Sequence, residues 1–177
     1  PDPQEYSRRI QQITKPYGRF EPGNTGIAYR YRNANSVQFS AFPVDTHMLV
    51  AHLQQNAREN WRYRGITQER IGEILVDNKD SFLKPATASW KQPLQKSADH
   101  DDRLVTVQFP TSINGPYVLT AELEGGNTAH ILRWQNNLML TSFTLENEQF
   151  FLLADAATGQ PKPNRKITFW SAIHSKD

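Results

Sequence analysis

Apolar and polar residues alternate with a period of two through much of this sequence. From Ile27 to Tyr31 every second residue is large and apolar, and from Val37 to Ala41 apolar residues alternate with Gln and Ser. Because successive side chains of a β-strand point to opposite faces, this alternation predicts strands with one buried face. The turn residues Asn33-Ala34-Asn35 separate the two runs, which predicts that they form a hairpin.

Turn-bounded extended segments recur along the first 135 residues. They predict seven strands, at Ile10–Lys15, 24–32, 36–44, 87–94, 103–109, 115–124 and 127–134. The turn Gly125-Gly126-Asn127 should join the last two. Short antiparallel strands at this spacing favour two packed sheets over a parallel α/β fold. We therefore predict a mainly all-β chain, with an antiparallel seven-stranded immunoglobulin-like β-sandwich over residues 1–135.

The stretch at about 46–77 departs from this alternation. Leu49 and Leu53 begin a repeat of helical spacing, and Thr46 precedes it as a candidate N-cap. Thr67 is the candidate cap of a second short helix that carries Ile71, Ile74 and Leu75. We predict a helical insertion between strands.

Residues 136–177 contain three more turn-bounded runs. These are Leu138–Leu145, Phe150–Asp155 and Ile167–Trp170. They predict either extra strands that widen the sandwich or the start of a second sandwich domain. The chain begins Pro1-Asp2-Pro3 without an initiator Met, so we expect it to be part of a longer protein.

Charge and composition exclude several classes of function. The chain has 20 Lys and Arg against 18 Asp and Glu, and no segment is strongly basic, so we expect no nucleic-acid partner. Cysteine is absent, which excludes disulfides, thiolate metal sites and a cysteine nucleophile. No apolar run approaches the ~18 residues of a membrane span, so this segment should not insert into a bilayer.

Catalytic and metal-binding patterns are lacking. His47 and His52 are five residues apart on the predicted helix, a spacing that points the two rings in different directions. The acidic run Asp99–Asp102 is best explained as a solvated loop. No nucleophile elbow, P-loop or dinucleotide-binding glycine motif occurs. We predict no cofactor, no metal and no enzymatic activity; a secreted hydrolase would need a cleft with perturbed carboxylates.

Aromatic and arginine side chains suggest contact surfaces. The run Trp61-Arg62-Tyr63-Arg64 lies between the predicted helices, where exposed aromatic and Arg side chains suit a protein interface. With Trp90, this run is also the basis of an alternative, a carbohydrate-binding accessory module in which flat rings stack on sugars. The candidate interface residues are Trp61, Arg62, Tyr63, Arg64, Trp90, Asp155 and Gly159.

The segment from Phe150 to Phe169 holds the most specific pattern. A strand should end at Asp155, whose carboxylate can accept from turn amides, while Gly159 supplies a flexible corner. The segment resembles the D-x-x-T-G-x-P-V-x-x-A-x-V corner of extracellular β-sandwich modules, including the macroglobulin-like domains of bacterial alpha-macroglobulins. Lys162 replaces the usual small apolar residue, and Arg165 and Lys166 replace the small residue and its neighbour.

Two other segments strengthen the resemblance. The Phe20–Phe39 segment is similar to the opening of such a domain, where an aromatic-x-P-G turn leads into a strand. Gly115–Ala121 is similar to its G-x-Y-x-v-x-a strand. The chain thus resembles an N-terminal-side segment of a bacterial alpha-2-macroglobulin family protein.

The resemblance implies a non-enzymatic scaffold or interaction domain of a large multidomain protein. Such proteins are exported to the periplasm or cell surface and inhibit proteases by trapping them, often with a Gly-Cys-Gly-Glu-Gln thioester. That motif is absent from this chain, so any trap chemistry must lie elsewhere. The implied partners are neighbouring domains of the larger polypeptide and proteases, the latter through the full-length protein.

Overall fold

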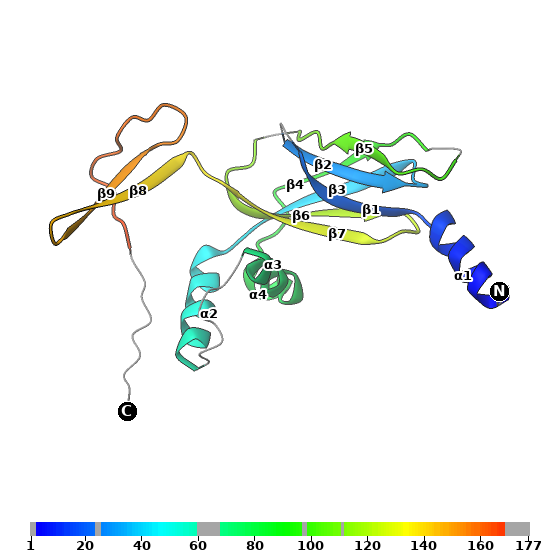
Figure 1. The fold of residues 1–177 in the computed structure, drawn as a ribbon, viewed down its shortest axis with the longest axis horizontal. Helices are drawn as coiled ribbons and strands as arrows, with labels where there is room; N and C mark the ends of the chain where they lie inside the picture. Colours follow the sequence, from blue (N-terminus) through cyan, green and yellow to red (C-terminus); the bar gives the residue numbers. More distant parts are fainter. Residues whose placement is uncertain (1–2, 24–25, 60–67, 97–98, 111, 169–177) are drawn as a thin grey trace.

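The computed structural model describes residues 3–23, 26–59, 68–96, 99–110 and 112–168. The elements follow one another along the chain as shown in Figure 1. They are α1 (Pro3–Thr14), β1 (Tyr17–Gly23), β2 (Gly26–Arg32), β3 (Ser36–Pro43), α2 (Thr46–Glu59), α3 (Gln68–Asp77), α4 (Lys79–Phe82), β4 (Ala88–Pro93), β5 (Arg103–Thr106), β6 (Gly115–Leu123), β7 (Thr128–Gln135), β8 (Leu138–Leu145) and β9 (Glu148–Asp155).

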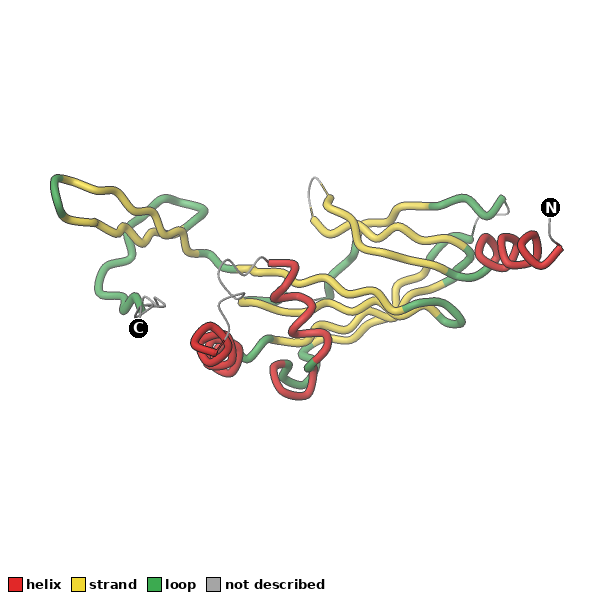
Figure 2. Tube along the Cα trace, turned by 60° about the horizontal axis from the view of Figure 1, so that its bottom comes forward, coloured by secondary structure: helices red, strands yellow, loops and turns green. Residues whose placement is uncertain are grey.

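Two antiparallel sheets form the body of the molecule. One has the strand order β1-β2-β5 and the other β4-β3-β6-β7. Figure 2 shows them as two layers, one above the other. The predicted antiparallel seven-stranded sandwich is therefore confirmed.

The alternating apolar residues supply the core between the sheets. Tyr29 of one sheet and Phe39 and Leu119 of the other are each 0% exposed. The Tyr29 and Phe39 rings meet edge to face, with centroids 5.5 Å apart. Such aromatic pairs add a geometric preference to the burial of apolar area. Alternation thus predicted correctly which faces of the central strands are buried.

The predicted pairing of β2 with β3 is wrong. β2 pairs with β1 and β5, whereas β3 pairs with β4 and β6, so the turn carries the chain from one sheet to the other. Asn33 begins the crossing with a positive φ of 57°, and its side chain donates to the carbonyl oxygens of Ile13 and Lys15. Because β2 and β3 belong to different sheets, their apolar faces meet across the core.

The predicted strand at Ile10–Lys15 is also wrong. Ile10 to Thr14 are the last residues of α1, Lys15 follows the helix, and the first strand of the sandwich is β1 instead. An ion pair between Arg9 and Glu5, one helical turn apart, accompanies the helix. Its apolar residues Tyr6, Ile10 and Ile13 recur at helical spacing, which the period-two interpretation missed.

The predicted helical insertion is confirmed over the described residues. α3 and α4 pack against the outer face of the four-stranded sheet, where Leu75, Phe82 and Val118 share a second apolar cluster. Asp45, not Thr46, caps α2: its Oδ1 accepts from the amides of His47 and Met48, both at 3.1 Å. Thr67 lies outside the described residues.

Two amide side chains tie the sheets together along their edges. Asn127, in the β6–β7 turn, accepts from the Gly18 amide and donates to the Gly18 carbonyl, each at 2.8 Å. On the opposite edge Gln92 of β4 donates to the Thr106 carbonyl and accepts from the Gln108 amide. Each side chain satisfies backbone groups at the place where a sheet would otherwise end.

β8 and β9 form a separate two-stranded sheet. In both views this hairpin projects beyond the end of the sandwich (Figures 1 and 2). Its eight paired positions run from Leu138↔Asp155 to Leu145↔Glu148. Of the predicted strand Ile167–Trp170, the first two residues are not in a strand and the other two lie outside the described residues. The domain boundary at 135 stays a prediction.

Candidate interaction surface

The corner after β9 has the geometry that its sequence predicts. Asp155 Oδ1 accepts from the amides of Ala157 and Thr158, both at 3.1 Å, and from the Thr158 hydroxyl at 3.2 Å. Gly159 has a φ of 71°, a conformation that favours glycine, and its amide donates to the Asp155 carbonyl. The carboxylate therefore organises the turn.

Electrostatics hold this carboxylate in its charged form. The Thr158 amide and then the Lys162 ammonium lower the pKa of Asp155 below its ordinary value. The ion pair joins Lys162 Nζ and Asp155 Oδ2 at 3.3 Å. A backbone bond from the Lys162 amide to the Leu153 carbonyl folds the segment after the corner back onto β9.

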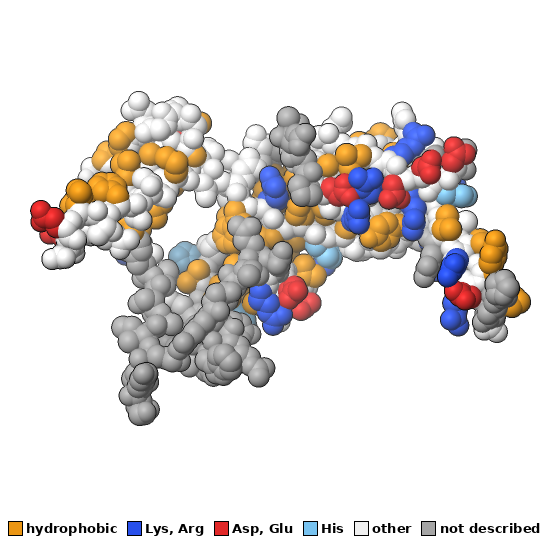
Figure 3. Space-filling model, viewed as in Figure 1, with side chains coloured by type: hydrophobic (Ala, Val, Ile, Leu, Met, Phe, Trp, Pro, Cys, Tyr) orange, Lys and Arg blue, Asp and Glu red, His pale blue; other side chains and the backbone are white. Residues whose placement is uncertain are grey.

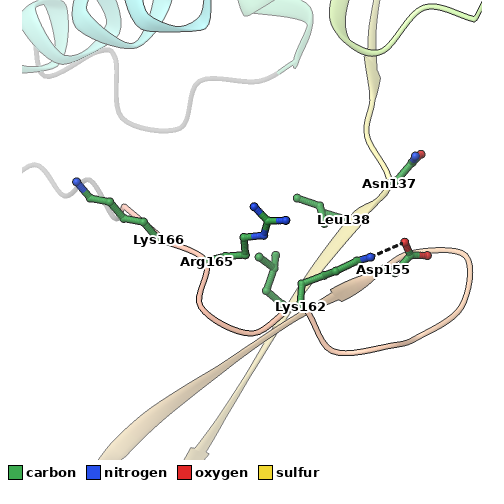
Figure 4. A pocket seen from close by; sticks show the side chains of 7 residues that line it. Asn137, Leu138, Asp155, Lys162, Arg165 and Lys166 are labelled. Atoms are coloured by element: carbon green, nitrogen blue, oxygen red, sulfur yellow. Dashed lines mark ion pairs between the residues drawn. The ribbon is translucent and has the colours of Figure 1, made fainter.

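A hollow of about 670 Å³ lies beside this corner (Figure 4). Leu138 and Leu153 contribute apolar side chains from the hairpin, and Lys162, Arg165 and Lys166 contribute cations from the returning segment. In Figure 4 Lys162 points toward Asp155, and the Arg165 guanidinium lies near Leu138. This hollow combines apolar walls with an excess of positive charge.

Both faces of the β8–β9 hairpin are apolar. Directly paired residues share a face, so Leu138, Leu140, Phe151 and Leu153 lie on one side. The opposite side carries Met139, Phe143, Leu145, Phe150 and Leu152. Their exposed fractions reach 57% at Leu145, and Figure 3 shows apolar patches over the hairpin. The Phe143 and Phe150 rings stack across the two strands, with centroids 5.4 Å apart.

Of the predicted interface residues, the structure brings Asp155 and Gly159 together in one turn. Trp61, Arg62, Tyr63 and Arg64 lie outside the described residues. Trp90 is half-buried in β4, and its ring packs against Phe39 and Phe109 at the core of the sandwich, with centroids 5.4 and 5.3 Å away. An interface role for these residues stays a prediction, but packing against the core does not favour Trp90 as a sugar-stacking platform.

The described part of the chain holds no group of three or more His, Cys, Asp and Glu side chains that could bind a metal. His100, in the acidic run, places its Nδ1 2.6 Å from Asn33 Oδ1. His52 packs edge to face on Phe82, with ring centroids 5.0 Å apart. Both rings thus have structural contacts. No helix within the described ranges is long and apolar enough to span a bilayer.

Sequence reasoning missed the exposed apolar residues of the hairpin as a contact surface. The signal was present, because Leu138-Met139-Leu140 and Phe150–Leu153 are continuous apolar runs rather than alternating ones. Such runs are typical of strands that are covered on both faces. We predicted strands from these runs but did not predict that both faces of the strands are apolar and exposed.

No family model matches this chain, and no curated protein matches it. Matching solved structures include two crystal structures of native alpha-2-macroglobulin from Escherichia coli. One spans domains NIE-MG1; it is 12% identical with a TM-score of 0.47, and the match covers 84% of this chain and 74% of the other. The second spans domains MG0-NIE-MG1; it is 16% identical with a TM-score of 0.48, covering 84% of this chain and 48% of the other.

Proposed function

We propose that this chain is a non-enzymatic scaffold and interaction domain of a larger, exported, alpha-macroglobulin-like protein that traps proteases. The observation that carries the proposal is the β8–β9 hairpin, which follows the seven-stranded sandwich and presents apolar side chains on both faces. The corner sequence after β9, with Asp155 and Gly159 in their expected geometry, supports the family assignment.

The hairpin requires cover from elsewhere. A lone two-stranded hairpin is at best marginally stable in water, because it has one ladder and no core. Covering a half-exposed Leu or Phe side chain is worth roughly 1 kcal/mol. Phe143, Phe150 and Leu145 are each between 40% and 57% exposed. Further strands of the same polypeptide would supply the missing ladder partners and a layer facing the side that carries Phe143, Leu145 and Phe150.

This requirement gives the two segments of the chain different roles. Residues 1–135 are one macroglobulin-like sandwich with a helical insertion, and residues 136–177 begin a second sandwich domain. Contacts between adjacent domains would then set their relative orientation. The role is mechanical: the domain holds neighbouring domains in place when the full-length protein closes on a protease.

The size and location of the native product test this proposal. An antibody raised against the chain should detect, in periplasmic or surface fractions of source cells, a band many times larger than the 20.3 kDa of this sequence. A cytoplasmic band near 20 kDa would overturn it. Stoichiometric capture of a protease by the isolated chain would also contradict a scaffold role.

Limited proteolysis tests the domain division separately. Gln135 ends β7, the last strand of the sandwich, and Asn136 and Asn137 connect it to β8. A nonspecific protease should cut there first and leave a resistant fragment close to residues 1–135. Initial cleavage inside the sandwich, with the connection intact, would show that the hairpin belongs to the same folded unit.

A further inference from the structure

The segment after β9 carries three cations, two of them at positions where the sequence pattern it resembles has small residues. Lys162 stands in place of a small apolar residue, and Arg165 and Lys166 stand further along the same segment. These three side chains line one hollow, together with Leu138 and Leu153 of the hairpin (Figure 4). Lys162 pairs with Asp155 of the turn, but no bond of the turn involves Arg165 or Lys166, so turn geometry does not account for these two cations.

Among the described residues that line the hollow, cations outnumber acidic side chains. Asp155 is its one described acidic residue, and that carboxylate is already paired with Lys162 and bonded to two turn amides. Within the described residues, neither Arg165 nor Lys166 forms an ion pair, and both are exposed. Two positive charges therefore remain available to an anionic partner.

The hollow also has an apolar wall that continues along the hairpin. Leu138 is 44% exposed, and Leu140 and Phe151 extend the same face at 48% and 39%. A small inorganic anion would pair with the cations and leave these apolar side chains exposed to solvent. A peptide with carboxylates and apolar side chains on opposite sides of its backbone would use both.

We propose that this hollow docks an acidic, extended protein segment that carries apolar residues between its carboxylates. The carboxylates pair with Arg165 and Lys166, and the apolar side chains cover Leu138 and the adjoining hairpin face. Charge complementarity selects this occupant over a basic or purely apolar one. The inference does not rest on the proposed function, because it needs only the local geometry of the corner and the hairpin.

The test uses the full 177-residue chain and a capped ten-residue peptide of alternating Glu and Leu as the probe. Amide chemical shifts, followed by two-dimensional NMR, should change saturably at Leu138, Leu153, Lys162, Arg165 and Lys166. Raising the salt concentration should weaken binding by about tenfold, because exposed charge pairs are screened. A peptide with Gln in place of Glu is the matched control for the probe.

Charge-reversal variants distinguish peptide binding at this hollow from nonspecific electrostatic attraction to basic residues elsewhere on the protein. Arg165→Glu with Lys166→Glu should weaken binding about tenfold or more, since two favourable contacts become repulsive. Lys91→Glu with Lys96→Glu makes the same change in net charge at exposed positions outside the hollow and should leave the affinity unchanged. Near-UV circular dichroism should show that all variants keep the fold.

Three outcomes would overturn the proposal. The Gln peptide could bind as tightly as the Glu peptide, which would make the charges irrelevant. The Lys91 and Lys96 variant could lose as much affinity as the Arg165 and Lys166 variant. Inorganic phosphate alone could produce the same shift changes at the same or higher affinity, which would assign the hollow to a small anion and not to a peptide.

Discussion

The sandwich and the β8–β9 hairpin use the same kind of strand but differ in what covers them. In the sandwich, Tyr29 and Phe39 are each 0% exposed because a second sheet lies opposite each of them. In the hairpin, Phe143 and Phe150 pair across two strands and remain 49% and 40% exposed. Strand pairing alone therefore does not make a core, which requires a second layer.

Core truncation should separate the two regions most strongly. Phe39→Ala should lower the free energy of unfolding of the sandwich by about 3 to 5 kcal/mol, because it leaves a cavity next to Tyr29 and Trp90. Phe143→Ala should change the same transition by less than about 0.5 kcal/mol. Urea titration followed by Trp fluorescence measures both. Equal losses would mean that hairpin and sandwich unfold as one unit.

Removing a side-chain amide that joins the two sheets should lower the stability by less than core truncation does. The loss should again be larger in the sandwich than in the link to the hairpin. Asn127→Ala removes both bonds to Gly18 and should cost about 1 to 3 kcal/mol, because partly buried backbone groups lose their partners. Asn136→Ala, which removes an exposed bond to the Leu138 amide, is the matched control in the link to the hairpin. Thermal unfolding should distinguish them, and an equal loss would refute the importance of the edge tie.

Acidification should produce the smallest and most local change. The pKa of Asp155 is lowered by its turn amides and Lys162, so its bonds are complete above the ordinary pKa of 3.8 and are lost as the pH falls through the lower folded-state value. The Ala157 and Thr158 amide shifts should move in that acidic range, before the sandwich unfolds. Asp155→Asn should abolish this titration; if the shifts still move, another group is responsible.

Local patterns predicted the strands better than their partners. Alternation at Val37, Phe39 and Ala41 correctly identified a buried face, and all three are 0% exposed. The same reasoning failed at Ile10 and Ile13, where a short run is compatible with strand or helix until one sees Tyr6 a turn earlier. At the start of α2, two adjacent residues had capping side chains, and only the backbone geometry selected Asp45.

The candidate surface was predictable in part. The turn at Asp155 and Gly159 could be derived from the sequence because its bonds join residues within five positions of one another. The hollow could not, because it depends on the segment after the corner folding back toward Leu138, across the hairpin. The sequence around Trp90 does not indicate whether its ring is exposed or packs against Phe39 and Phe109, because that depends on residues far away in the chain.

The sequence by itself determined the positions of β2 to β9, the helical insertion, the turn at Asp155 and the lack of cysteine chemistry, because these depend on neighbouring residues and composition. The tertiary structure decided that β2 and β3 lie in different sheets and that Asn127 joins those sheets. It also decided that three cations share one hollow beside the hairpin. These outcomes depend on contacts between residues far apart in the chain, whose free energies no local pattern encodes.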